Sequence, residues 1–249
     1  MKKISLFLVF VCGLMAVTAQ VPEIDWVFVK GGEFWMGCTD EQRRDCQPNE
    51  MPTHQVVLKD YYISKYEVTQ AQWTAVMGYN HSKVQGDSLP VTRVNWYEAR
   101  DFALRLSAMT GQKYRVPTEA EWEYAARGGS QSKQYRFSGS DNINEVAWYR
   151  KNSGRSPQPV GLLKPNELGI YDMSGNVYEW CFDGIDFYNA YFGEALYDPQ
   201  GNPWHSVKVC RGGGMTSFSD VCRVSARSAN DEYQRLNYVG FRLVREVTE

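Results

Sequence analysis

Three segments of the chain carry the same helix-start signal, and a glycine follows each of them. The three signals are Thr69 with Gln72, Asn95 with Glu98, and Thr118 with Glu121. In each pair a capping oxygen stands three residues before a Glu or Gln, so that the two residues satisfy each other's free backbone N–H groups. The closing glycines are Gly78, Gly111 and Gly128. Because glycine readily takes the left-handed conformation that ends a helix, we expect three helices that end at these positions.

The remaining sequence predicts short strands and ordered loops rather than further long helices. Residues 27–36 resemble a hairpin around Gly31 and Gly32, and residues 55–63 alternate as one strand. Short strands are also expected at 207–211 and 240–244. We see no repeat and no low-complexity linker, and hydrophobic residues make up 43% of the chain. We therefore predict a single α+β domain over residues 20–249 with low regular secondary structure.

The first nineteen residues have the layout of a secretory signal peptide. Lys2 and Lys3 precede an apolar run from Ile4 to Met15, and small residues lead to a cleavage site after Ala19. The run is short for a membrane span, and Val11 is a poor residue before a lipidated Cys12. We therefore expect residues 1–19 to be removed and the protein to be exported, periplasmic or extracellular, and not membrane-spanning.

Export leaves five cysteines, for which disulfides are the default in an oxidising compartment. They are Cys38, Cys46, Cys181, Cys210 and Cys222. Cys38 and Cys46 flank a short polar loop that suits a local disulfide, and Cys210 and Cys222 form a second candidate pair. Five is an odd number, so at least one cysteine stays free or pairs with another molecule.

Charge and motif content exclude several classes of function. The formal net charge of the chain is -2, so nothing indicates a nucleic-acid partner. The three histidines are scattered without metal-ligand spacing, and no phosphate-binding or dinucleotide-binding loop occurs. The partner expected for such a chain is a protein or a glycan.

A glycine-rich run from Gly169 to Trp180 brings two oxygen-bearing side chains together. Asn176 and Glu179 stand three residues apart, with backbone carbonyls between them. Calcium takes oxygen ligands of these kinds, backbone carbonyls included. An Asn-stabilised turn with Glu179 paired to an arginine explains the same residues, and the residues alone favour that interpretation.

Arginines crowd the segment that follows the glycine turn at 211–214. They are Arg223, Arg227, Arg235 and Arg242. Arginines at this density usually form planar ion pairs that hold loops, and less often recognise an anionic ligand. Cys222 stands among them, and positive charge nearby would lower the pKa of its thiol. A half-cystine is the alternative interpretation.

Seven segments in this order resemble the formylglycine-generating enzyme family, also called sulfatase-modifying factor domains. They are GGEFWMG at 31–37, EVTQAQW at 67–73, PVTRVNW at 90–96, RVPTEAEWEYAARGG at 115–129, GNVYEW at 175–180, RGG at 211–213 and GFR at 240–242. The resemblance covers essentially the whole chain after residue 20. It implies one domain related in shape to C-type lectins. It also implies a calcium ion bound by Gly175, Asn176, Val177 and Glu179, whereas residues 144–153 do not match a second calcium site of the family.

The activity of the family depends on a cysteine pair that this chain does not carry. Members oxidise a sulfatase cysteine to formylglycine with oxygen and copper(I), which two thiolates hold five residues apart. Counted forward from Arg211, the pair falls on Ser217 and Cys222, and counted back from Arg227 its second position falls on Ser219. We therefore expect no copper site and no formylglycine synthesis. A copper site rebuilt from Cys210 and Cys222 is conceivable, and a disulfide between them is the stronger expectation.

These observations favour an exported, non-catalytic member of the family that acts as a binding module. The expected binding face is Gly212 to Tyr238, with Met215, Phe218, Tyr233, Asn237 and Tyr238 as contacts, although the same aromatic residues could simply pack the core. A component of an envelope or secretion assembly is a third possibility. The alternative is an oxidase that makes formylglycine through Cys222, the sole candidate catalytic residue.

Overall fold

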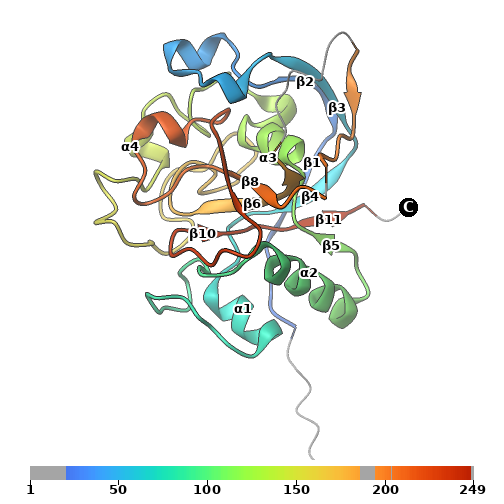
Figure 1. Ribbon diagram of the computed structural model, residues 1–249, viewed down its shortest axis with the longest axis vertical. Coiled ribbons are helices and arrows are strands. Elements are labelled where there is room, and N and C mark those ends of the chain that lie inside the picture. The colour runs from blue at the N-terminus through green and yellow to red at the C-terminus, as the bar shows by residue number, and fades with distance from the viewer. Residues whose placement is uncertain (1–20, 186–193, 203, 248–249) are drawn as a thin grey trace, which may run out of the picture.

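The computed structural model describes residues 21–185, 194–202 and 204–247 (Figure 1). The expected signal peptide therefore lies outside the described residues. The α-helices are α1 Gln70–Met77, α2 Trp96–Thr110, α3 Glu119–Ala126 and α4 Ile143–Val146. Short 3-10 turns are η1 Asp40–Asp45, η2 Pro48–Glu50, η3 Gly129–Gln131 and η5 Ser219–Cys222. The strands are β1 Trp26–Val29, β2 Gly32–Met36, β3 His54–Leu58, β4 Tyr61–Ser64, β5 Tyr114–Arg115, β6 Tyr178–Gly184, β7 Leu196–Tyr197, β8 Val207–Arg211, β9 Arg227–Asp231, β10 Val239–Gly240 and β11 Val244–Glu246.

The three capping boxes are confirmed. Thr69, Asn95 and Thr118 are the N-caps of α1, α2 and α3, and in each the reciprocal side-chain and backbone hydrogen bonds are present. Helices α1 and α2 end at left-handed glycines, as expected. Helix α3 differs slightly, because Arg127 is its C-cap and the left-handed Gly128 follows one residue later. Local signals were therefore sufficient to place these helices.

The strand pairing differs from the expected hairpin. Strands β1 and β2 do not pair with each other, since β1 pairs with β4 and β2 pairs with β3, both antiparallel. The expected strand at 55–63 is split into β3 and β4, which belong to different sheets. The three sheets have the orders β1-β4-β11-β5, β10-β6-β8-β9 and β2-β3-β7. Partners distant in sequence decide these pairings, so a local reading of residues 27–36 was wrong.

Two apolar clusters hold the sheets and helices together. Helix α3 lies among β2, β3, β6 and β8, and its Trp122 and Ala125 are fully buried. The second cluster lies under α1 and α2, where the rings of Trp73 and Phe102 stack with centroids 5.6 Å apart. Figure 1 shows α1 and α2 together at one end of the molecule and the β2–β3 pair at the other. The fold is the expected single α+β domain, with much of its chain in ordered loops between these elements.

Within the described residues, no helix is both long enough and apolar enough to cross a membrane.

Candidate functional site

The strand β6 brings three family segments side by side. It pairs antiparallel with β8, with Glu179 opposite Arg211, and parallel with β10, with Glu179 opposite Gly240. The turn after β8 then folds back over this junction, because Gly212 and Gly213 take φ values of 90° and 72°. A Cβ on Gly213 would lie 2.7 Å from the Cys222 sulfur, so only glycine fits there. The three-glycine turn therefore fixes where η5 and Cys222 lie.

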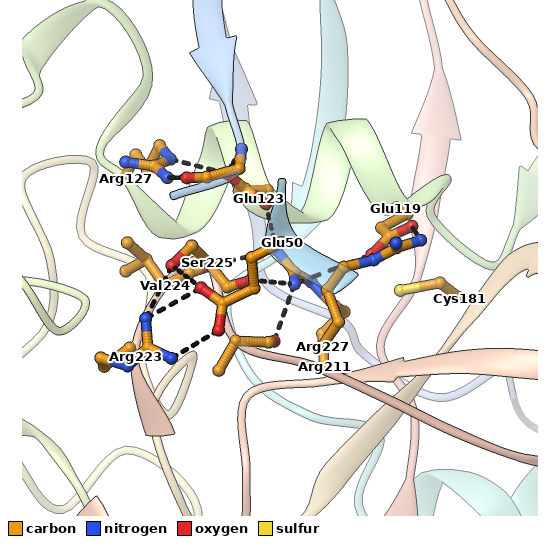
Figure 2. Close-up of polar contacts among 12 residues, drawn as sticks. Glu50, Glu119, Glu123, Arg127, Cys181, Arg211, Arg223, Val224, Ser225 and Arg227 are labelled. Carbon is orange, nitrogen blue, oxygen red and sulfur yellow. Dashed lines mark hydrogen bonds and ion pairs between the residues drawn. The ribbon is translucent and has the colours of Figure 1, made fainter. Parts of the chain in front are cut away.

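The arginines of the C-terminal segment hold loops through ion pairs, as the favoured interpretation predicts, and Figure 2 shows this for Arg211, Arg223 and Arg227. Each pairs with a glutamate from a distant element. The pairs are Arg211–Glu123, Arg223–Glu50, Arg227–Glu119, Arg235–Glu98 and Arg242–Glu179. Both side chains of the Arg223–Glu50 pair are fully buried, and Ser225 donates a further hydrogen bond to the same carboxylate at 2.6 Å. These guanidinium groups are therefore held by carboxylates, although Arg227 also lines a small pocket and the Arg235 side chain is 48% exposed.

Cys222 is fully buried and lies in a small apolar cluster with Phe137 and Tyr149. Burial raises the pKa of its thiol to about 12, and the charge of Asp220 adds to the effect. The expected lowering of this pKa by nearby arginines is therefore wrong, because those arginines face glutamates. At neutral pH the thiol of Cys222 stays protonated and is a poor nucleophile.

The disulfide between Cys38 and Cys46 is confirmed, whereas the expected one between Cys210 and Cys222 is wrong. Cys210 is a free, buried thiol on β8 that faces the cluster under α1 and α2, and Cys222 belongs to a different cluster. The amide of Asn230 donates to the Cys210 sulfur at 3.4 Å, and burial raises the pKa of this thiol to about 12. Cys181 is also free and buried. The two cysteines that the sequence suggested as a pair therefore belong to different apolar clusters and are not bonded to each other.

The residues at the expected copper positions do not fit copper(I). Ser217 occupies the first position counted from Arg211, and its hydroxyl accepts from Gly214 N at 3.0 Å and contacts the Tyr178 hydroxyl at 3.2 Å. A serine oxygen is a hard ligand, and copper(I) prefers thiolates. Ser219, on which the second position falls when counted back from Arg227, is exposed and is an equally poor copper(I) ligand.

The residues expected to bind calcium lie together, but their oxygens already accept hydrogen bonds. The Oδ1 atom of Asn176 accepts from Gln158 N at 3.0 Å. Both oxygens of Glu179 accept from Arg242, at 2.6 and 2.7 Å, and one also accepts from the Trp122 indole at 2.7 Å. No three His, Cys, Asp or Glu side chains are grouped as metal ligands anywhere in the described part of the chain. These oxygen atoms have the right chemistry to be calcium ligands, but the ion would have to draw Glu179 away from Arg242.

Buried carboxylates outnumber cations around this junction. Glu67 accepts from the Asn176 amide at 2.6 Å and from Val177 N at 3.1 Å, and it is fully buried. Burial, with the charges of Asp172 and Glu179, raises its pKa well above the ordinary value. Burial likewise raises the pKa of Asp172 to about 6. Sequence reasoning missed Glu67 as part of this site, although it begins the family segment at 67–73.

A pocket of about 320 Å³ opens beside the glycine turn. It brings together three of the five expected binding residues, namely Met215, Asn237 and Tyr238. Thr216 also lines it, as does Thr92 from the family segment at 90–96. The remaining lining residues come from loops that the sequence did not indicate, and they are Lys83, Val84, Arg155 and Pro157. No periodicity or motif marks the loops of these last four residues, and only the folded chain brings them to the 215–238 segment.

The other two expected binding residues lie outside this pocket. Phe218 is 60% exposed and carries the Arg150 guanidinium 4.5 Å above its ring. Tyr233 is 64% exposed and packs against Tyr97, with ring centroids 5.2 Å apart. Neither ring packs the core, so the alternative that these aromatic residues are core residues is wrong for both.

The fold, the five arginine–glutamate pairs of the C-terminal segment and the glycine turn define a class of protein. Residues 13–247 match the family described as the sulfatase-modifying factor enzyme 1-like domain, and the chain belongs to this family.

Three relatives illustrate the range of the family. The chain is 33% identical to the chaperone protein LppX of Paenibacillus barcinonensis over 90% of its own length and 92% of that protein. It is 33% identical to the formylglycine-generating enzyme of Streptomyces coelicolor over 70% of its length, and it spans 58% of that enzyme. Its fold superimposes on Treponema denticola variable protein 1 with a TM-score of 0.80 and 29% identity, over 89% of this chain and 95% of that one.

Proposed function

We propose that this chain is an exported, non-catalytic member of the family that acts as a binding module, either alone or within an envelope assembly. The main support comes from the two positions where the family would hold copper. Ser217, which accepts a hydrogen bond, stands at one of them in place of a cysteine, and Cys222 at the other is a buried, protonated thiol. The nearest alternative thiol by sequence, Cys210, faces a different apolar cluster. A chain arranged in this way lacks two thiolates that could converge on one soft ion.

A polypeptide partner is the form of binding that the relatives support best. LppX carries the name of a chaperone, and this chain aligns with nearly its whole length. The pocket beside the glycine turn offers this chain a place for such contacts. The signal-peptide layout of residues 1–19 supports export, so we expect the partner in the periplasm, at the cell envelope or outside the cell.

Calcium is part of the proposal as a structural ion at Gly175, Asn176, Val177 and Glu179. Three buried carboxylates, those of Glu67, Asp172 and Glu179, lie around one guanidinium, that of Arg242, and a divalent cation would relieve this surplus of negative charge. Its ligands would be largely backbone carbonyls.

A direct assay separates a binding module from an oxidase. The purified chain is incubated with copper, oxygen and a sulfatase-type peptide that contains one cysteine, and the mass of the peptide is measured by mass spectrometry. We expect no conversion of the cysteine to the aldehyde, while the Streptomyces coelicolor enzyme converts it under the same conditions. Conversion that Cys222→Ser abolishes would establish the oxidase instead.

A further inference from the structure

The pocket beside the glycine turn combines an apolar floor with a polar rim. Met215 and Pro157 are buried in its floor, and Tyr238 and Val84 are partly exposed along its sides. Thr216 and Asn237 are exposed at the rim and carry neutral hydrogen-bonding groups. A volume of about 320 Å³ is at the low end for ligand pockets, so it holds one or two side chains rather than a large cofactor.

Two cations at the rim, Lys83 and Arg155, lack a partner. Both are exposed, and neither forms an ion pair with any described residue. Lys30 and Lys59, outside the pocket, are paired, with Asp60 at 2.8 Å and with Asp198 at 3.0 Å, whereas Lys133 and Lys151 are exposed without an ion pair to any described residue, as Lys83 and Arg155 are. The two rim cations differ from Lys133 and Lys151 in that they line one pocket together. No Asp or Glu occurs among the described residues that line the pocket. The pocket is therefore a local positive site on a molecule whose formal net charge is -2.

The backbone around the pocket is held in place before any ligand arrives. Met215 N donates to Asn176 O at 2.7 Å, and the Ser153 hydroxyl donates to Met215 O at 2.7 Å. The same Ser153 hydroxyl accepts from Arg155 N at 3.0 Å, so one side chain positions both the floor and a rim cation. On the other side, Gln70 donates to Val84 O at 2.9 Å. A preformed pocket loses little entropy when a ligand binds.

We propose that this pocket binds an extended acidic segment of a partner protein, with an apolar side chain over Met215 and flanking carboxylates at Lys83 and Arg155. This inference rests on the proposed function. Arginine binds carboxylates through paired hydrogen bonds, and clusters of cations recognise acidic motifs in this way. Recognition of an anionic membrane normally uses a cluster of about four to eight lysines and arginines, and two cations around a hollow do not fit that pattern.

The test is a direct binding measurement with two short fluorescent peptides. One alternates glutamate with leucine, and the other, of the same length, alternates lysine with leucine. We expect the full chain after residue 19 to bind the glutamate peptide and not the lysine peptide in fluorescence anisotropy. Added salt should weaken binding, because it screens exposed charges.

Charge-reversal variants locate the binding. The double variant Lys83→Glu and Arg155→Glu should bind the glutamate peptide at least about ten-fold more weakly. The matched control is Lys113→Glu with Lys133→Glu, which changes the net charge equally at exposed positions outside the pocket, and it should bind as the unaltered chain does. Circular dichroism and melting temperature check that both variants remain folded.

Three outcomes would overturn the inference. They are equal binding of both peptides, equal weakening by both double variants, and binding to phosphatidylglycerol vesicles without binding to the glutamate peptide. The outcome of the peptide-oxidation assay does not depend on these results. A chain that oxidises cysteine can bind an acidic peptide or fail to bind it. Failure of the inference is thus distinguishable from failure of the proposed function.

Discussion

At the scale of single residues, the C-terminal arginines show how far chemistry can be inferred from residue type alone. Their density predicts ion pairs, and the structure contains them, because guanidinium groups fit carboxylates wherever loops must be tied together. Their partners could not be predicted, since Glu50 lies 173 residues before Arg223. The protonation of Cys222 was also misjudged, because its environment depends on which way those arginines point.

The buried pair of Arg223 and Glu50 should matter far more to stability than an exposed pair. We expect Arg223→Met to lower the free energy of unfolding by about 3–5 kcal/mol, since it leaves the Glu50 charge buried without its partner. The control is Arg235→Met at the more exposed pair with Glu98, for which we expect about 0–1 kcal/mol. Urea unfolding followed by fluorescence measures both, and equal losses would contradict the buried-pair argument.

The thiols give a second prediction at this scale. Cys181, Cys210 and Cys222 are buried, and burial raises the pKa of each, so none should react with iodoacetamide in the folded chain at pH 8. After unfolding without reductant, three thiols of the chain after residue 19 should become alkylated. One alkylated thiol after unfolding would instead indicate a second disulfide.

At the scale of elements, the sequence predicted the structures that depend on local signals and missed those that depend on long-range contacts. The N-caps of α1, α2 and α3 lie within three residues of their partners, and all three were predicted correctly. The pairing of β1 with β4 joins Trp26 to Ser64, and no property of residues 27–36 contains that information. The pocket was predicted only on the side contributed by 215–238, because its other wall, apart from Thr92, comes from loops without a motif.

The three-glycine turn is an element whose shape only glycine permits. Gly213→Ala should destabilise the chain strongly, because a Cβ there would lie 2.7 Å from the Cys222 sulfur and 2.8 Å from Val221 O in a left-handed backbone. Gly78→Ala is the matched control, since its backbone is also left-handed but nothing lies within 4 Å of the added Cβ. We expect about 1 kcal/mol for Gly78→Ala and several-fold more for Gly213→Ala in thermal unfolding. Similar losses would mean that the turn is not packed against Cys222.

The calcium proposal is tested at the turn that precedes β6. A ligand that binds only the folded state stabilises it, so removal of calcium by a chelator should lower the melting temperature and added calcium should restore it. Magnesium at the same concentration is the control. An unchanged melting temperature, with no metal in elemental analysis, would mean that Arg242 alone neutralises Glu179.

At the scale of the whole molecule, the chain has the fold of the family, and we propose that it lacks the family's catalytic cysteine pair. The ordered set of seven segments was sufficient to predict the family, because each segment builds part of one scaffold: helix caps, the strand β6 junction and the glycine turn. It could not predict a partner, since four of the residues that line the pocket come from loops outside the seven segments. The proposed acidic-peptide pocket combines these loops with residues of the segment that follows the glycine turn.

The most direct test of the account compares peptide oxidation by this chain and by the Streptomyces coelicolor enzyme, with equal copper, oxygen and cysteine peptide, over a time course read by mass spectrometry. The account predicts that only the Streptomyces enzyme produces the aldehyde, because this chain has Ser217 and a buried, protonated Cys222 where copper(I) needs two thiolates. Aldehyde formed by this chain and lost in Cys222→Ser would contradict it.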